Sequence, residues 1–309
     1  LMFKRKRYSY RDLPVRMAEL GTVHRHELSG ALHGLMRVRC FTQDDAHIFM
    51  TEAQIENEIQ KVVKLIDEVY KKFGFTYHVE LSTRPDDSMG TEEEWEVATN
   101  ALENAIKAMN IPYEVNEGDG AFYGPKIDIQ AKNVYGKEDT MITIQLDCAI
   151  AENFDLYYID QNGDKVRPYI IHRTSMGCYE RTLAWLIEKY AGKFPTWLCP
   201  EQVRVLPISE KYEEYANKVC AELKKNDIDV TVDNRSEKIG FKIREARLDK
   251  LPYMLVVGQQ EEADGTVSVR SRFAGNEGTK SLDEFIDAIC KEIRTKEIRK
   301  ELPEEEKKR

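Results

Sequence analysis

Two prolines just before residue 201 separate two different patterns of strands and helices, and this change constrains the fold more than any other feature. The segment 194–200 reads Phe-Pro-Thr-Trp-Leu-Cys-Pro. Before it, β-rich stretches dominate from 122 to 172 and helical patterns precede and follow them. After it, strands and helices alternate with short connections, which predicts a small α/β domain with a mixed sheet. We therefore expect two domains, a mainly antiparallel α+β domain over 1–197 and an α/β domain over 198–309.

Local signals predict several elements of the first domain. Thr51 with Gln54 and Thr91 with Glu94 have the spacing of capping boxes, so each pair predicts the start of a helix. The run Gln-Asn-Gly-Asp at 161–164 predicts a hairpin turn between two strands. Two further strands are expected over 16–25 and 35–41. In the second domain we expect strands at 203–208, 228–232, 253–257 and 266–272, and helices at 210–226, 239–249 and 281–297.

Composition narrows the class of protein. The six cysteines are scattered and form no CxxC pair, which is typical of reduced thiols in a cytosolic protein. Apolar runs stay well below the roughly 20 residues that cross a bilayer, and no secretory leader is recognisable. The net charge of −9 argues mildly against a nucleic-acid binder. Six basic residues nevertheless gather within 235–250, which predicts either a phosphate-binding face or simply a solvated helix face.

Arginines at two places favour phosphate binding. Arg25 and Glu27 end one predicted strand, and Arg37 and Arg39 share one face of the next because strand side chains alternate. Guanidinium groups give permanently charged, bidentate contacts to phosphate. Arg181 lies in the first turn of a predicted helix, where the N-terminus already attracts anions. Taken alone, each place fits structural salt bridges better than a phosphate site.

Two histidines are candidates for a metal site. Gln43, Asp45 and His47 share one face if 41–49 is extended, and His172 lies on a distant predicted strand. Two imidazoles are common zinc ligands, but spacing alone favours satisfied structural histidines over ligands.

The sequences of these segments resemble those of one protein family. Arg25-His-Glu27 with Gly-Leu-Met-Arg-Val-Arg-Cys-Phe-Thr-Gln-Asp-Asp-Ala-His over 34–47 is similar to the second signature motif of class II aminoacyl-tRNA synthetases, in its threonyl form. Gly177-Cys-Tyr-Glu-Arg181 resembles the third motif. Matching segments occur at 122–128, 143–145, 236–245 and 252–256, so the resemblance to threonyl-tRNA synthetases covers essentially the whole chain.

The resemblance implies a fold and an activity. The fold is an antiparallel-sheet class II catalytic core over 1–197, without its first motif, followed by an anticodon-binding domain over 198–309. The activity is that of a cytoplasmic threonine–tRNA ligase in protein biosynthesis, which uses ATP and Mg²⁺ to join threonine to tRNA(Thr). The full-length protein is expected to be a homodimer, with neither DNA nor a membrane as a partner.

The resemblance also assigns roles to single residues. Arg25 would hold the α-phosphate and the threonine carboxylate, Glu27 the adenine amino group, and Arg181 the γ-phosphate, assisted by Arg39. Asp45 would accept a hydrogen bond from the threonine hydroxyl. The other assigned residues are Gln43, Tyr123, Lys126 and Gln145 for substrate or ATP binding, His47 and His172 for Zn²⁺, and Ser236, Arg244, Glu261 and Arg270 for the anticodon.

The third zinc ligand of the family, a cysteine, is expected before Leu1, and Cys40, Cys148 and Cys178 do not match its position. The first motif and the editing domain are also expected upstream, so we expect the chain by itself to have little activity. A non-catalytic tRNA-binding or regulatory module derived from a synthetase is the alternative. Such modules usually lose the phosphate-binding arginines, whereas Arg25 and Arg181 are both present.

Overall fold

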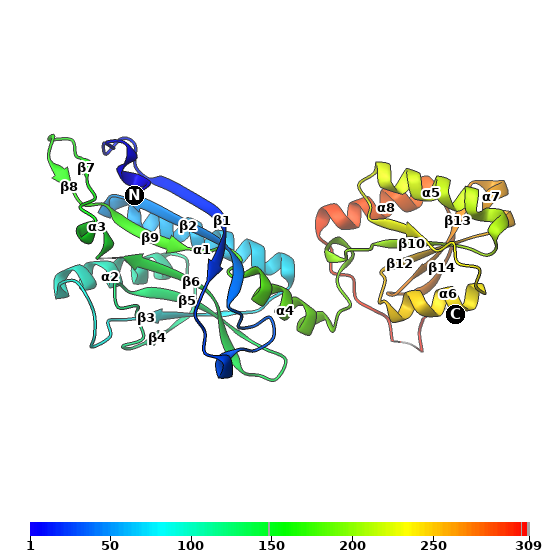
Figure 1. The fold of residues 1–309 in the computed structure, drawn as a ribbon, viewed down its shortest axis with the longest axis horizontal. Helices are drawn as coiled ribbons and strands as arrows, with labels where there is room; N and C mark the ends of the chain where they lie inside the picture. Colours follow the sequence, from blue (N-terminus) through cyan, green and yellow to red (C-terminus); the bar gives the residue numbers. More distant parts are fainter. Residues whose placement is uncertain (148, 304, 308–309) are drawn as a thin grey trace. The chain divides into compact units, whose positions relative to one another are not determined.

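A computed structural model describes residues 1–147, 149–303 and 305–307, and it divides into two compact units, Leu1–Glu188 and Lys189–Arg309 (Figure 1). Five cysteines in the described part are free thiols, and Cys148 lies outside the described residues. None of the described helices has the length and apolar character needed to span a bilayer.

A seven-stranded sheet with the order β1-β2-β9-β6-β5-β3-β4 forms the first unit. Its neighbouring strands are antiparallel except for the β3–β4 pair. The mainly antiparallel sheet predicted for this part of the chain is therefore confirmed. The strands are β1 Val15–His24, β2 Cys40–Met50, β3 His78–Ser82, β4 Tyr113–Asn116, β5 Lys126–Lys132, β6 Glu138–Asp147 and β9 Tyr169–Arg173, and a separate hairpin pairs β7 Tyr158–Ile159 with β8 Lys165–Val166.

Two long helices, α1 and α2, pack against each other beside this sheet (Figure 1). Both predicted capping boxes are present, at Thr51–Gln54 just before α1 and at Thr91–Glu94 at the start of α2. Most apolar residues of α1, from Ile55 to Tyr70, are buried, so burial of an amphipathic face anchors the helix. The helical segments of the unit are α1 Ile55–Phe73, α2 Glu92–Ala108, α3 Ile150–Asn153 and α4 Tyr179–Tyr190, with short 3₁₀ turns at Phe3–Arg5 (η1), Ser29–Ala31 (η2) and Glu52–Gln54 (η3).

The predicted strand over 35–41 is wrong. Residues 34–36 form a turn, and β2 begins only at Cys40. Gly34 has φ +48, a left-handed value that glycine adopts readily and that ends the extended chain. Arg37 and Arg39 therefore lie in a loop instead of sharing a strand face.

The second unit contains a five-stranded sheet with the order β11-β10-β12-β13-β14. The first three strands in this order are parallel, and β13 and β14 are antiparallel, so the predicted mixed sheet is confirmed. Helices α5 and α8 supply residues to one core, and α6 to a second, smaller one. The elements are η4 Thr196–Leu198, β10 Val203–Pro207, η5 Glu210–Tyr212, α5 Glu213–Lys225, β11 Val230–Val232, α6 Ile239–Leu248, β12 Tyr253–Val257, α7 Gln259–Asp264, β13 Thr266–Ser271, β14 Gly275–Ser281 and α8 Leu282–Thr295.

Candidate active site

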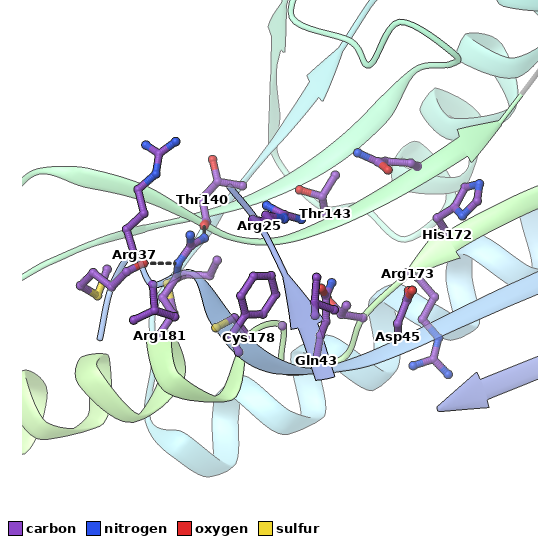
Figure 2. A pocket seen from close by; sticks show the side chains of 18 of the residues that line it. Arg25, Arg37, Gln43, Asp45, Thr140, Thr143, His172, Arg173, Cys178 and Arg181 are labelled. Atoms are coloured by element: carbon purple, nitrogen blue, oxygen red, sulfur yellow. Dashed lines mark hydrogen bonds between the residues drawn. The ribbon is translucent and has the colours of Figure 1, made fainter. Parts of the chain in front are cut away.

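A polar cavity of about 500 Å³ opens in the first unit (Figure 2). Alternate residues of β2 and β6 point into it because strand side chains alternate between the two faces of a sheet. Eight of the predicted site residues line this cavity, although they come from positions far apart in the sequence: Arg25, Glu27, Gln43, Asp45, Tyr123, Gln145, His172 and Arg181.

Strand register brings four of the predicted site residues into one row across the sheet. His47 on β2 is the register partner of His172 on β9. His172 in turn pairs with Gln145 on β6, and Gln145 pairs with Lys126 on β5. Cross-strand partners have Cβ atoms roughly 5 Å apart, so register alone places these four side chains side by side.

Arg181 and Arg25 both line the cavity, and neither forms a salt bridge with a carboxylate among the described residues. Arg181 donates from Nε to the carbonyl of Met36 at 3.2 Å and from Nη1 to that of Thr140 at 2.9 Å. The Arg25 guanidinium lies 5.1 Å from the centre of the Phe41 ring. Two such cations in one polar cavity form a strong anion-binding arrangement.

Glu27 is held by the loop that replaces the predicted strand. Its carboxylate accepts a hydrogen bond from Arg37 Nε at 3.1 Å, and its carbonyl accepts one from Arg39 Nε at 2.9 Å. Arg37 lines the cavity, whereas Arg39 is not among the lining residues. Arg39 therefore fixes the backbone beside the cavity in this structure.

The opposite end of the cavity contains His172 and Asp45 (Figure 2). The His47 and His172 rings are edge to face with centroids 4.5 Å apart. Burial and the neighbouring His172 lower the pKa of His47, although Asp45 and Asp147 act in the opposite direction. The Tyr123 hydroxyl donates to Gln145, and burial raises the pKa of this tyrosine.

The donor set at this end fits two of the three protein ligands of a zinc site. His172 Nε2 lies 2.8 Å from Oδ2 of Asp147, whose side chain is fully buried. Metal-binding histidines commonly make this contact, because a carboxylate fixes the ring and leaves the other nitrogen for the metal. Among the residues that the structure describes, no cysteine or carboxylate joins His47 and His172 in a cluster of three possible ligands.

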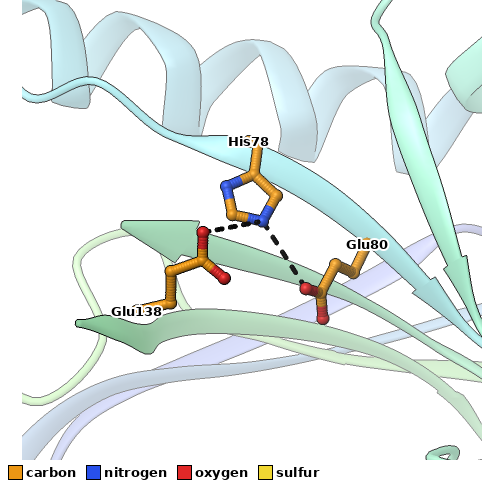
Figure 3. Close-up of side chains that lie close together, drawn as sticks. All are labelled: His78, Glu80 and Glu138. Carbon is orange, nitrogen blue, oxygen red and sulfur yellow. Dashed lines mark ion pairs between the residues drawn. The ribbon is translucent and has the colours of Figure 1, made fainter. Parts of the chain in front are cut away.

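A different group of possible ligands, absent from our predictions, lies on β3 and β6 (Figure 3). His78 Nε2 is 3.5 Å from Glu80 and 4.0 Å from Glu138. Protein partners already engage both carboxylates, because Gln130 donates to Glu80 at 3.0 Å and Lys132 is 3.4 Å from Glu138. These contacts account for the cluster without a metal ion.

Lys126 lies in the cross-strand row but outside the cavity lining. Its ammonium group is 2.9 Å from Asp119 and 2.8 Å from Asp128. Burial lowers the pKa of Lys126, but these two hydrogen-bonded carboxylates outweigh it and raise the pKa overall. Two carboxylates thus hold this lysine in place.

Thr140 and Arg173 also line the cavity, although neither was predicted as a site residue. Arg173 directly follows His172 at the end of β9, and no motif marked it. Thr140 contributes its carbonyl to Arg181, a backbone role that is independent of residue type and leaves no sequence signal.

The residues predicted to read the anticodon are distributed over the second unit. Ser236 is in the loop after β11 and lines a cavity of this unit. Glu261 is in α7, a helix that we did not predict, and its carboxylate accepts a hydrogen bond from the Gly258 amide at 2.9 Å. Because β11 and β12 both run parallel to β10, the segments that follow them, which contain Ser236 and Glu261, lie at the same end of the sheet.

Arg244 is exposed on α6, and Arg270 lies on β13 opposite Met254 of β12. Met254 belongs to the core formed with α6, so the Arg270 side chain shares the face of the sheet on which α6 packs.

The basic cluster at 235–250 is only partly a solvated face. Lys242 is 3% exposed and donates to the carbonyls of Pro207 at 3.2 Å and Asp233 at 2.8 Å. Arg235 pairs with Asp233 and Glu245. The prediction of a solvated face is therefore wrong for Lys242. This lysine is structural and hydrogen-bonds the loop after β11 and the end of β10.

Comparisons with known proteins agree with both units. The family described as tRNA synthetase class II core domain (G, H, P, S and T) matches residues 1–190, and the anticodon binding domain family matches residues 202–292. The fold and the cavity thus define a class II tRNA synthetase core followed by an anticodon-binding domain.

Individual relatives narrow the family. The chain is 60% identical over 298 residues to a threonine–tRNA ligase of Caldanaerobacter subterraneus subsp. tengcongensis, covering 96% of this chain and 46% of that protein. It is 59% identical over 290 residues to one of Clostridioides difficile, covering 94% and 45%. The chain thus spans about half the length of these curated relatives.

A solved structure extends the likeness to three dimensions. The crystal structure of the RNA binding domain of threonyl-tRNA synthetase from Cryptosporidium parvum matches with a TM-score of 0.88 and 43% identity, covering 94% of this chain and 73% of that one. The chain belongs to the threonyl-tRNA synthetase family.

Proposed function

We propose that this chain provides the threonine-activating site and the anticodon-binding domain of a threonine–tRNA ligase. In the first reaction, a carboxylate oxygen of threonine attacks the α-phosphorus of ATP, and the bond to pyrophosphate breaks. In the second, a ribose hydroxyl at the 3′ end of tRNA(Thr) attacks the carbonyl carbon of threonyl-adenylate, and AMP leaves.

The observation that supports the proposal best is the two-ended cavity. The guanidinium groups of Arg25 and Arg181, which lack carboxylate partners among the described residues, share it with Asp45 and His172. Negative charge concentrates on the triphosphate during adenylate formation, so preplaced cations lower the barrier without reorganisation. In this proposal Arg25 contacts the α-phosphate, Arg181 the γ-phosphate and Glu27 the adenine, and Mg²⁺ neutralises phosphate charge when bound.

Threonine would occupy the histidine end. Zn²⁺, held by His47, His172 and a ligand from outside this chain, would act as a Lewis acid for the amino and hydroxyl groups of the substrate. Asp45 would accept a hydrogen bond from the hydroxyl, and Gln43, Tyr123 and Gln145 would position the amino group and backbone. Valine lacks the hydroxyl and would leave buried polar groups unpaired, which disfavours it strongly.

The second unit would bind the anticodon through Ser236, Arg244, Glu261 and Arg270. Unpaired bases are recognised by stacking and by hydrogen bonds to their edges, for which Arg and Glu side chains are suited. We further propose that the full-length protein is a homodimer that works in the cytoplasm, where its free thiols stay reduced.

Threonine-dependent exchange of pyrophosphate into ATP tests the activation step. We expect exchange from a version extended upstream far enough to include the third zinc ligand, and little from the chain alone. Exchange driven by proline or serine, but not by threonine, in the extended version would refute the proposal. Loss of exchange in Arg181→Ala, with unchanged thermal unfolding, distinguishes the enzyme from a non-catalytic module.

A further inference from the structure

The carboxylate of Asp44 connects the strand that carries the threonine-binding side chains to the segment that leads to Arg181. Asp44 Oδ2 accepts from the backbone amides of Ser175 at 2.8 Å and Met176 at 3.1 Å, and Oδ1 accepts from Gly177 at 3.1 Å. The Ser175 hydroxyl also donates to Oδ2. One side chain thus satisfies three consecutive backbone donors.

Two more contacts join the same parts of the chain. The Glu180 carboxylate in the first turn of α4 accepts from the Thr42 amide at 3.0 Å, and Gln43 forms a backbone bridge with Cys178. Three successive residues of β2 therefore contact the segment 175–180. The odd-numbered residues Gln43 and Asp45 face the cavity, whereas Asp44 points away from it and into this contact.

The turn in this segment passes close to β6. Gly177 has φ +81, and a Cβ built at this position would lie 2.6 Å from the carbonyl oxygen of Met141 on β6. A side chain at this position would be strained and would clash with β6, so the turn requires glycine. Arg181 follows one helical turn later, so the position of this turn determines where its guanidinium enters the cavity.

We propose that Asp44 is a positioning residue for Arg181, and that it sets the affinity of the site for the terminal phosphates of a nucleoside triphosphate. The proposal rests on the assignment of Arg181 to the γ-phosphate. In this proposal β2 links the two ends of the cavity. Gln43 and Asp45 of this strand face the threonine end, and Asp44 between them positions Arg181 at the triphosphate end.

The test compares Asp44→Asn with Asp160→Asn. Asparagine keeps the size of Asp44 but turns one acceptor into a donor that faces backbone amides. Asp160 makes a matched control because it also accepts from two backbone amides, those of Asn162 and Asp164, in the hairpin between β7 and β8. Binding of Mg²⁺-ATP and of AMP is measured for the upstream-extended protein and for both variants.

We expect Asp44→Asn to weaken ATP binding by about tenfold while AMP binding changes less than about twofold, because AMP lacks the γ-phosphate assigned to Arg181. Groups coupled through one contact network also act together and not additively. In an Arg181→Ala background the same substitution should have no further effect on ATP binding. An equal loss of ATP and AMP affinity, or full additivity with Arg181→Ala, would overturn the proposal.

Hydrogen–deuterium exchange of the peptide that covers 174–178 provides a readout independent of nucleotide. Its amides should exchange faster in Asp44→Asn than in the wild type or in Asp160→Asn. Unchanged exchange of this peptide would disprove that Asp44 holds the segment 175–177, even if ATP affinity fell. If the wild type bound AMP and ATP equally, the assignment of Arg181 would fail along with the positioning role, whereas this exchange result would still show whether Asp44 holds the segment.

Discussion

The imidazole rings of His47 and His172 lie edge to face with centroids 4.5 Å apart, on neighbouring antiparallel strands and at register-paired positions. They are 125 positions apart in the sequence, so strand pairing alone brings them together. This contact lies beside the cavity that also contains Arg25 and Arg181.

Replacing one of these histidines should remove zinc. We expect His47→Asn in the upstream-extended protein to lower zinc affinity at least about tenfold, in line with the loss seen when a metal site is disturbed. Metal analysis after dialysis measures it. His78→Asn is the matched control from the His78–Glu80–Glu138 group and should retain full zinc content. Loss of zinc from this variant instead would show that the metal binds at the His78–Glu80–Glu138 group and not at His47 and His172.

Asp45 should control the choice of amino acid. Removing a hydrogen bond to a charged group costs roughly 1.5–3 kcal/mol, so Asp45→Ala should lower kcat/KM for threonine by roughly 10- to 150-fold. The smaller gap between threonine and valine would be seen in pyrophosphate exchange with each amino acid. An unchanged ratio of the two rates would rule out contact between Asp45 and the hydroxyl.

Gly124 should tolerate no side chain. A Cβ at this position would lie 1.9 Å from the carbonyl oxygen of Leu146. The backbone of β6 would have to shift, and such overpacking costs about 1–3 kcal/mol or more. Thermal unfolding of Gly124→Ala should therefore show a clear loss of stability. Gly30→Ala is the control, because no atom lies within 4 Å of a Cβ there; equal melting temperatures for the two variants would contradict the expectation.

Acid should weaken the second unit partly through Asp233. The hydrogen bonds from Arg235 lower the pKa of this carboxyl group, although burial acts against them. A lowered folded-state pKa adds stability above the unfolded-state value of about 3.9, and this stability disappears as pH falls through the folded-state pKa.

The variant Asp233→Asn lacks this titration. It should be less stable than the wild type at pH 7, and the difference should shrink toward pH 3 when urea unfolding is followed at both pH values. Asp287→Asn, at an exposed position on α8, should not change the pH dependence. A constant difference between Asp233→Asn and wild type across this range would show that ionisation of Asp233 does not contribute.

Features that depend on nearby residues were predictable from sequence. Thr51 with Gln54 and Thr91 with Glu94 cap their helices as predicted, because both partners lie three residues apart on one turn. The turn at 161–164 joins β7 and β8 for the same reason. The mixed sheet of the second unit followed from the alternation of strands and helices.

Other predictions failed where the local signal was weak. The two arginines of 35–41 looked like one strand face, but Arg37 and Arg39 instead hold Glu27 from a loop. Helix α7 has six residues, too few to show a helical period, and β14 is a polar strand without alternation. Lys242 was expected on a phosphate-binding or a solvated face, because no local pattern shows that it is buried and donates to two backbone carbonyls.

The sequence by itself therefore determined the kinds of elements, the two-part organisation and the family, since each follows from residues within a few positions or from a motif. Only the tertiary structure decided that His47, His172, Gln145 and Lys126 share one row, and that Asp44 holds the turn before Arg181. Strand register and long-range hydrogen bonds set these relationships, and both depend on how separate segments of the chain, such as β2 and β9, pair as the core closes.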